Sequence, residues 1–195
     1  PLISAAMDTV TEARLAIALN TGNTGNLQRL LGGEGWTMAQ LTPVLQSLTA
    51  QEWAAVQAVW DHFESYRPQI AEKERRVYGK EPEWVAPQPF AVTTADGSTV
   101  TLRGGYYPIK YDPAASQRAE EHADAESAKR QLQGAYTTAT TRRSFTKARV
   151  EEVSGRPLLY TLAGMYSGVN DVIHDLAWHE WLIDANRLLR SHTID

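Results

Sequence analysis

The chain has 195 residues, of which 43% are hydrophobic and 22% are charged, a composition that is typical of a globular protein and excludes a disordered tail. The formal net charge of −4 argues against a surface that binds nucleic acid throughout, although it allows one local basic patch. The absence of cysteine excludes disulfides and thiolate metal sites, and no apolar run approaches the ~20 residues that cross a bilayer.

The first part of the chain predicts short helices in series. Apolar residues at helical spacing indicate a helix over residues 7–19, which should end before the turn signal Asn20–Asn23. A second helix should run over residues 25–31 and stop at Gly32-Gly33. Thr37 can cap the next helix, which carries an apolar face as far as Leu48.

A longer helix should follow the capping box Thr49–Glu52, in which a hydroxyl and a carboxylate satisfy exposed amides. Pro68 should kink this helix, because proline lacks an amide hydrogen and clashes with the preceding turn. Basic side chains near Gly79 are expected to face the negative end of the helix dipole. The apolar stripe consists of Trp53, Val56, Trp60, Phe63, Ile70 and Val77, and the basic residues are Lys73, Arg75, Arg76 and Lys80.

Residues 81–89 contain three prolines and must run extended. Two segments with β-forming residues then flank Asp96-Gly97, which predicts a hairpin at about residues 90–103. A glycine-hinged extended segment continues to residue 112. Its Tyr106 and Tyr107 could form a platform that binds a ligand or a protein, or they could simply pack a strand bend.

The third part predicts an alanine-rich helix over residues 114–132, a threonine-rich loop over residues 135–147, and a last helix from about Pro157 to Arg190. Trp178 and Trp181 lie on a second apolar face of that last helix. A helix with two apolar faces requires two packing partners, inside the domain or outside it.

Together these patterns predict a mainly α, helical bundle-like domain with one β-hairpin and a long C-terminal helix. We expect a helical segment at residues 1–80, an extended segment with the hairpin at residues 81–112, and C-terminal helices at residues 113–195. We also expect the chain to be a fragment of a larger polyprotein.

Candidate catalytic residues gather on the last helix, where Asp171, His174, Asp175 and His179 occur at spacings of three and four residues. Two carboxylates and imidazoles could bind a divalent metal or transfer protons. The spacing lacks the paired histidines of the zinc-peptidase helix, so a structural polar network is the favoured interpretation. The sequence assigns no metal site and predicts no cofactor.

A basic run offers a second candidate site. Arg142, Arg143, Lys147 and Arg149 lie near hydroxyl side chains, and both types of group bind phosphate oxygens. The same run is typical of a solvated connecting loop. Contact with DNA or another nucleic acid is therefore an alternative hypothesis.

Several stretches resemble a domain of the large polyvalent proteins of bacteriophages and prophages, the PLxRFG type. They are Ala18–Asn23, Trp53–Trp60, Glu72–Gly79, Leu102–Ile109 and Val172–Leu176. The resemblance implies a module of a giant virion-associated protein that is ejected with the DNA into the host cytoplasm. We therefore expect a non-enzymatic interaction module, whose partners are other segments of the same polyprotein or other virion proteins.

Residues 1–15 locally resemble a segment of inosine monophosphate dehydrogenase. The rest of the sequence has no cysteine nucleophile, no phosphate-binding glycine loop, and too little chain for a ~250-residue barrel. We interpret this local match as fortuitous.

Overall fold

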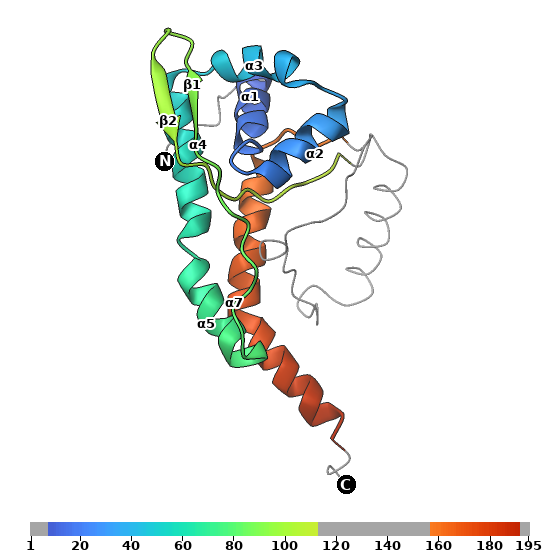
Figure 1. The fold of residues 1–195 in the computed structure, drawn as a ribbon. Helices are drawn as coiled ribbons and strands as arrows, with labels where there is room; N and C mark the ends of the chain where they lie inside the picture. The colour runs from blue at the N-terminus through green and yellow to red at the C-terminus, as the bar shows by residue number, and fades with distance from the viewer. Residues whose placement is uncertain (1–7, 113–156, 192–195) are drawn as a thin grey trace.

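The computed structural model describes residues 8–112 and 157–191, and it is mostly helical with a two-stranded antiparallel hairpin (Figure 1). Its elements are α1 (Thr9–Leu19), α2 (Thr24–Glu34), α3 (Met38–Gln46), α4 (Ala50–Glu64), α5 (Arg67–Tyr78), β1 (Phe90–Thr93), β2 (Thr99–Leu102) and α7 (Ala163–Leu189). This confirms the predicted fold class, including the long C-terminal helix. Within the described ranges, no helix combines the length and apolar character needed to span a membrane.

Side-chain caps fix the starts of three helices. Asp8 accepts a hydrogen bond from the Thr11 amide at the start of α1, and Asn23 accepts one from the Asn26 amide at the start of α2. At the start of α4, the predicted capping box forms: Thr49 accepts from the Glu52 amide, and the Glu52 carboxylate accepts from the Thr49 amide at 2.7 Å. These bonds satisfy amides that have no partner inside the helix.

The predicted end of α2 is wrong. The helix continues through Gly32-Gly33 and ends at Glu34, where the Gly35 amide donates to the Leu31 carbonyl. Glycine lowers helix propensity by only about 1 kcal/mol, which packing readily offsets, and Gly33 is buried.

The kink predicted at Pro68 is instead a break between two helices. α4 ends at Glu64 and α5 begins at Arg67, so Pro68 lies in the first turn of α5. A helix tolerates proline in this turn, because the missing amide hydrogen would have no partner there anyway.

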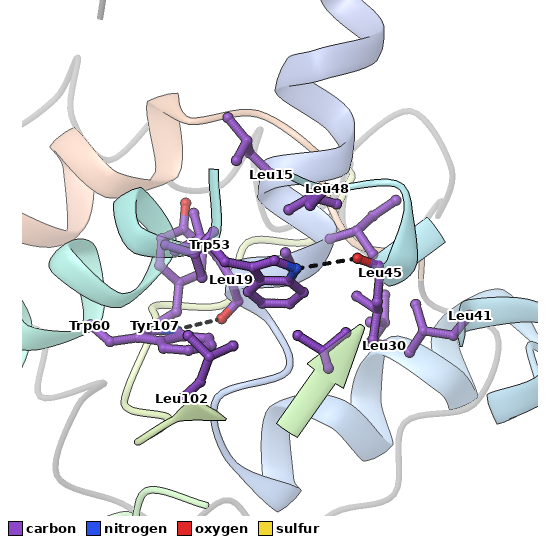
Figure 2. Packing of buried hydrophobic residues seen from close by; sticks show 14 of the residues in the cluster. Leu15, Leu19, Leu30, Leu41, Leu45, Leu48, Trp53, Trp60, Leu102 and Tyr107 are labelled. Carbon is purple, nitrogen blue, oxygen red and sulfur yellow. Dashed lines mark hydrogen bonds between the residues drawn. The ribbon is translucent and has the colours of Figure 1, made fainter. Parts of the chain in front are cut away.

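The main core lies between α1, α3, α4 and the hairpin, around two fully buried tryptophans. The Trp53 indole donates to the Leu45 carbonyl at 3.3 Å, and the Trp60 indole donates to the Leu19 carbonyl at 2.9 Å (Figure 2). Phe90 of β1 meets both indole rings edge-on. The apolar stripe that the sequence predicts on α4 is therefore buried, with its polar N–H groups satisfied.

The glycine-hinged segment after β2 packs against the turn between α1 and α2. The Gly22 carbonyl accepts hydrogen bonds from the amides of Gln88 and Gly105. A Cβ atom on Gly105 would lie 2.5 Å from the Cβ of Trp60, so only glycine allows this approach of the two segments. The close contact draws the following tyrosines against the core.

The last helix begins later than predicted, at Ala163 rather than at about Pro157. Residues 157–159 pair with residues 110–112 instead, through the bridge Tyr111–Leu158 and flanking backbone hydrogen bonds. The Leu162 amide then donates to the Glu12 carboxylate of α1 at 2.8 Å. From this start α7 runs beside α5, and its C-terminal part extends beyond the end of α5 (Figure 1).

Candidate functional site

A buried ionic cluster joins α5 to α7. Lys73 and Glu74 of α5 meet Asp175 and His179 of α7, and all four residues are buried. The Lys73 ammonium lies 3.0 Å from the Glu74 Oε1 and 3.2 Å from the His179 Nδ1, and it forms a close ion pair with Asp175. On the outer side, the Tyr78 hydroxyl lies 3.1 Å from the His179 Nε2.

The cluster continues an apolar contact between the same two helices. Ile70 and Val172 pack together in a small second core cluster. Lys73 and Glu74 follow Ile70 by three and four residues, and Asp175 follows Val172 by three residues, so they share the inward faces of α5 and α7. At the surface, Arg76 of α5 also pairs with Glu180 of α7 at 3.2 Å.

The donor set includes residue types that hold divalent metals. Ligand atoms of Glu74, Asp175 and His179 lie within 4.8 Å of one another in the described part of the chain. The Lys73 ammonium, however, contacts all three side chains and already supplies a positive charge at their centre. A catalytic metal site keeps one position open for water or substrate. The arrangement therefore favours a closed ionic contact between helices.

The structure divides the four predicted catalytic candidates. Asp175 and His179 enter the cluster, with the Asp175 Oδ1 and the His179 Nδ1 3.4 Å apart. Asp171 is half-buried and lies 3.6 Å from the Lys110 ammonium, and the half-buried His174 is not part of the cluster. The four side chains do not converge on one site.

Sequence reasoning missed Lys73 and Glu74 as members of this cluster. It grouped Lys73 with the basic side chains that face the negative end of the helix dipole, whereas the side chain is 1% exposed and pairs with carboxylates. The available signal was its position, because residues 73 and 74 complete a helical face with Ile70 and Val77. Residue type alone predicted the opposite, since lysine and glutamate are rarely buried unless they are paired.

Six large apolar side chains of α7 are between 50% and 79% exposed: Tyr166, Ile173, Trp178, Trp181, Leu188 and Leu189. By helical position Tyr166, Ile173, Trp181 and Leu188 lie opposite the buried face, and the other two lie to one side of it. The rings of Trp178 and Trp181 pack edge-on with their centroids 5.8 Å apart. The buried face consists of Gly164, Gly168, Val172, Asp175 and His179. The inward face of α7 thus combines small, apolar and charged residues, whereas the predicted second face with Trp178 and Trp181 is apolar and lies at the surface of the described part of the chain.

The two candidate tyrosines do not form an exposed platform. Tyr107 is buried in the core, where its ring meets Phe63 edge-on, and burial raises the pKa of its hydroxyl. Tyr106 is half-buried and also packs edge-on against Phe63. The physical reason is that the glycine segment lies very close to Trp60, and this position places both tyrosine rings against the core.

The predicted basic site lies outside the described residues. Arg142, Arg143, Lys147 and Arg149 all fall between residues 113 and 156. Nucleic-acid contact therefore stays a prediction.

In comparisons with known proteins, no family model matches the sequence, and no curated protein or solved structure matches it.

Proposed function

We propose that this chain is a helical interaction module, not an enzyme, and that α7 pairs with the α7 of a second copy. The observation that carries this proposal is the exposed apolar face of α7. Soluble proteins rarely leave large apolar side chains grouped in this way, and such groups are typical of interaction surfaces. The buried ionic cluster supports the proposal because it fixes how α7 lies on α5 and hence where this face points.

The exposed face is self-complementary in sequence. Its central line is Tyr166, Asn170, Ile173, Ala177, Trp181, Asp184 and Leu188, with spacings of four, three and four residues on each side of Ala177. In an antiparallel pair centred on Ala177, Tyr166 would face Leu188 and Ile173 would face Trp181. A small residue at the centre lets two helices approach closely. An interface of this kind is isologous, which is the usual arrangement in homodimers.

Polar side chains flank the exposed apolar line. By helical position, His174 lies on one side of it, and Glu180, which pairs with Arg76, lies on the other. A polar rim beside an apolar centre is the normal composition of a protein interface.

The resemblance to phage polyvalent proteins suggests a setting for this activity. In a virion-associated protein, pairing of α7 would join two copies of the parent polypeptide before ejection. The sequence resemblance supports this part of the proposal.

A cysteine crosslink tests the pairing, because the chain has no cysteine of its own. Ala177→Cys should form a disulfide-linked dimer under mild oxidation, since residue 177 would meet its own copy at the symmetry axis. Asn186→Cys is the matched control, because residue 186 is exposed and points away from the proposed interface. Adding Trp181→Glu to Ala177→Cys should abolish the crosslink.

Sedimentation equilibrium of the wild-type chain provides the second readout. We expect a monomer–dimer equilibrium that Trp181→Glu shifts to monomer. Equal crosslinking of the two cysteine variants, or a wild-type chain that stays monomeric at all accessible concentrations, would show that α7 does not pair with itself and would overturn the proposed function.

A further inference from the structure

A hollow of about 340 Å³ lies between α3 and the outer edge of β1. Its size falls at the lower end of the range for ligand pockets in proteins, roughly 300–1,000 Å³. None of its lining residues is charged. The walls are Met38, Thr42, Leu45 and Gln46 of α3, residues 90–93 of β1, and Thr21, Leu27 and Gln88.

The hairpin register determines which backbone groups of β1 face this hollow. The Thr94 amide donates to the Ser98 carbonyl, and the Gly97 amide donates to the Thr94 carbonyl, which defines a glycine bulge with Gly97 at φ 79°. Hydrogen-bonded pairs then alternate along the ladder, so Val92 pairs with Val100 through both amides. The N–H and C=O groups of Ala91 and Thr93 therefore point away from β2.

A neighbouring hydrogen bond shows that this outward edge faces α3. Ala95, the next residue in the same alternation, donates its amide to the Leu48 carbonyl just after α3. At the other end, the Gln88 amide donates to the Gly22 carbonyl. Between these two attachments, the edge of β1 presents two outward N–H groups and two outward C=O groups to the hollow.

We infer that this hollow binds a short, extended, uncharged peptide segment, which adds to β1 as a third strand. Backbone groups of an unpaired strand edge are complementary to another strand and to few other ligands. Met38, Thr42 and Leu45 recur at i, i+4 and i+7 on α3 and would contact every second side chain of that segment. The uncharged lining favours an uncharged occupant.

The attachments at each end limit the length of the segment. Residues 89–94 of the edge span about 17 Å in an extended strand, which corresponds to a segment of about five residues. Pro89 offers no amide hydrogen, so the open part of the edge is centred on Ala91 and Thr93. This site uses a different surface from the proposed α7 interface, and neither depends on the other.

The probe for the test is the blocked peptide acetyl-Val-Thr-Val-Thr-Val-amide, which is uncharged and favours strands. Titration into isotopically labelled protein should shift the amide resonances of Ala91 and Thr93 and the resonances of Met38 and Thr42 in a saturable manner. The same peptide with alternate backbone amides methylated should not bind, because it cannot complete the ladder.

A pair of proline variants tests which edge of the hairpin binds the peptide. Ala91→Pro removes one outward donor without removing a β1–β2 hydrogen bond, and we expect it to weaken peptide binding about tenfold. Thr101→Pro is the matched control: it removes an outward donor from β2, on the far edge, and should leave binding unchanged. Thr42→Arg places a charge in the hollow and provides a second variant that does not alter the strand.

Several results would overturn the inference. These are an absence of shifts at Ala91 and Thr93, equal binding of the methylated peptide, equal weakening by the two proline variants, or unchanged binding to a folded Thr42→Arg variant.

Discussion

The main core and the α5–α7 contact are held together by different forces. In the core, large apolar side chains surround Trp53 and Trp60, and the indole N–H groups find carbonyl partners. Between α5 and α7, Ile70 and Val172 form a small buried apolar cluster against which Leu176 packs. The ionic cluster of Lys73, Glu74, Asp175 and His179 lies beside it. The core is stabilised by burial of a large apolar area, whereas the α5–α7 contact depends on the pairing of specific charges.

This difference affects how each region tolerates change. Apolar packing adapts to substitutions of similar volume, whereas a buried charge that loses its partner is strongly destabilising. A buried ion pair adds little net stability over apolar residues, but it penalises any other alignment of the two helices. The cluster therefore specifies the position of α7 more than it strengthens the fold.

Removing a core tryptophan should have the largest effect on stability. Trp60→Ala should lower the free energy of unfolding by about 3–5 kcal/mol, because it leaves a cavity and an unpaired Leu19 carbonyl. Trp181→Ala is the matched control, since Trp181 is 59% exposed and should cost about 1 kcal/mol or less. Urea unfolding at dilute protein concentration measures both, and equal losses would contradict the core assignment.

Removing the buried ammonium should have a smaller and more local effect. Lys73→Met leaves Asp175 and Glu74 without their cation, which costs up to about 3–5 kcal/mol. If α7 separates from α5, water hydrates the carboxylates again, so the measured loss of unfolding free energy should be smaller than this value. Hydrogen exchange should show faster exchange in α5 and α7 while the amides around Trp53 stay protected.

A compensating variant distinguishes charge pairing from packing in this contact. Lys73→Met combined with Asp175→Leu should be more stable than Lys73→Met alone, since it removes one of the two buried carboxylates, Asp175 and Glu74, that lose the Lys73 cation. Lys80→Met, at an exposed position, should change stability by no more than about 0.5 kcal/mol. If the double variant is less stable than either single variant, the cluster acts through shape, not charge.

The same contrast explains what the sequence could predict. Apolar periodicity, capping residues and the Asp96-Gly97 turn were enough for the fold class, most helices and the hairpin, because these signals are local. The ionic cluster depends on α5 and α7 meeting across 102 residues, from Lys73 to Asp175. His179 and Asp175 were found by their spacing. For Lys73 the local signal was its place on the helical face of Ile70, but its residue type predicted an exposed side chain, as at Arg75.

A carboxylate between α1 and α7 provides a pH test with a smaller expected effect. Hydrogen bonds from the Thr161 hydroxyl and the Leu162 amide hold the pKa of Glu12 below its usual value of 4.5. Because the folded pKa is lower than the unfolded one, this stabilisation is fully present above the unfolded pKa and is lost as pH falls through the folded pKa. Glu12→Gln should therefore lose less unfolding free energy than the wild type between about pH 6 and about pH 3, as measured by urea unfolding. Glu83→Gln, at an exposed position, is the control and should show the wild-type dependence of unfolding free energy on pH. An unchanged pH dependence in Glu12→Gln would mean that the start of α7 is not attached to α1 through this carboxylate.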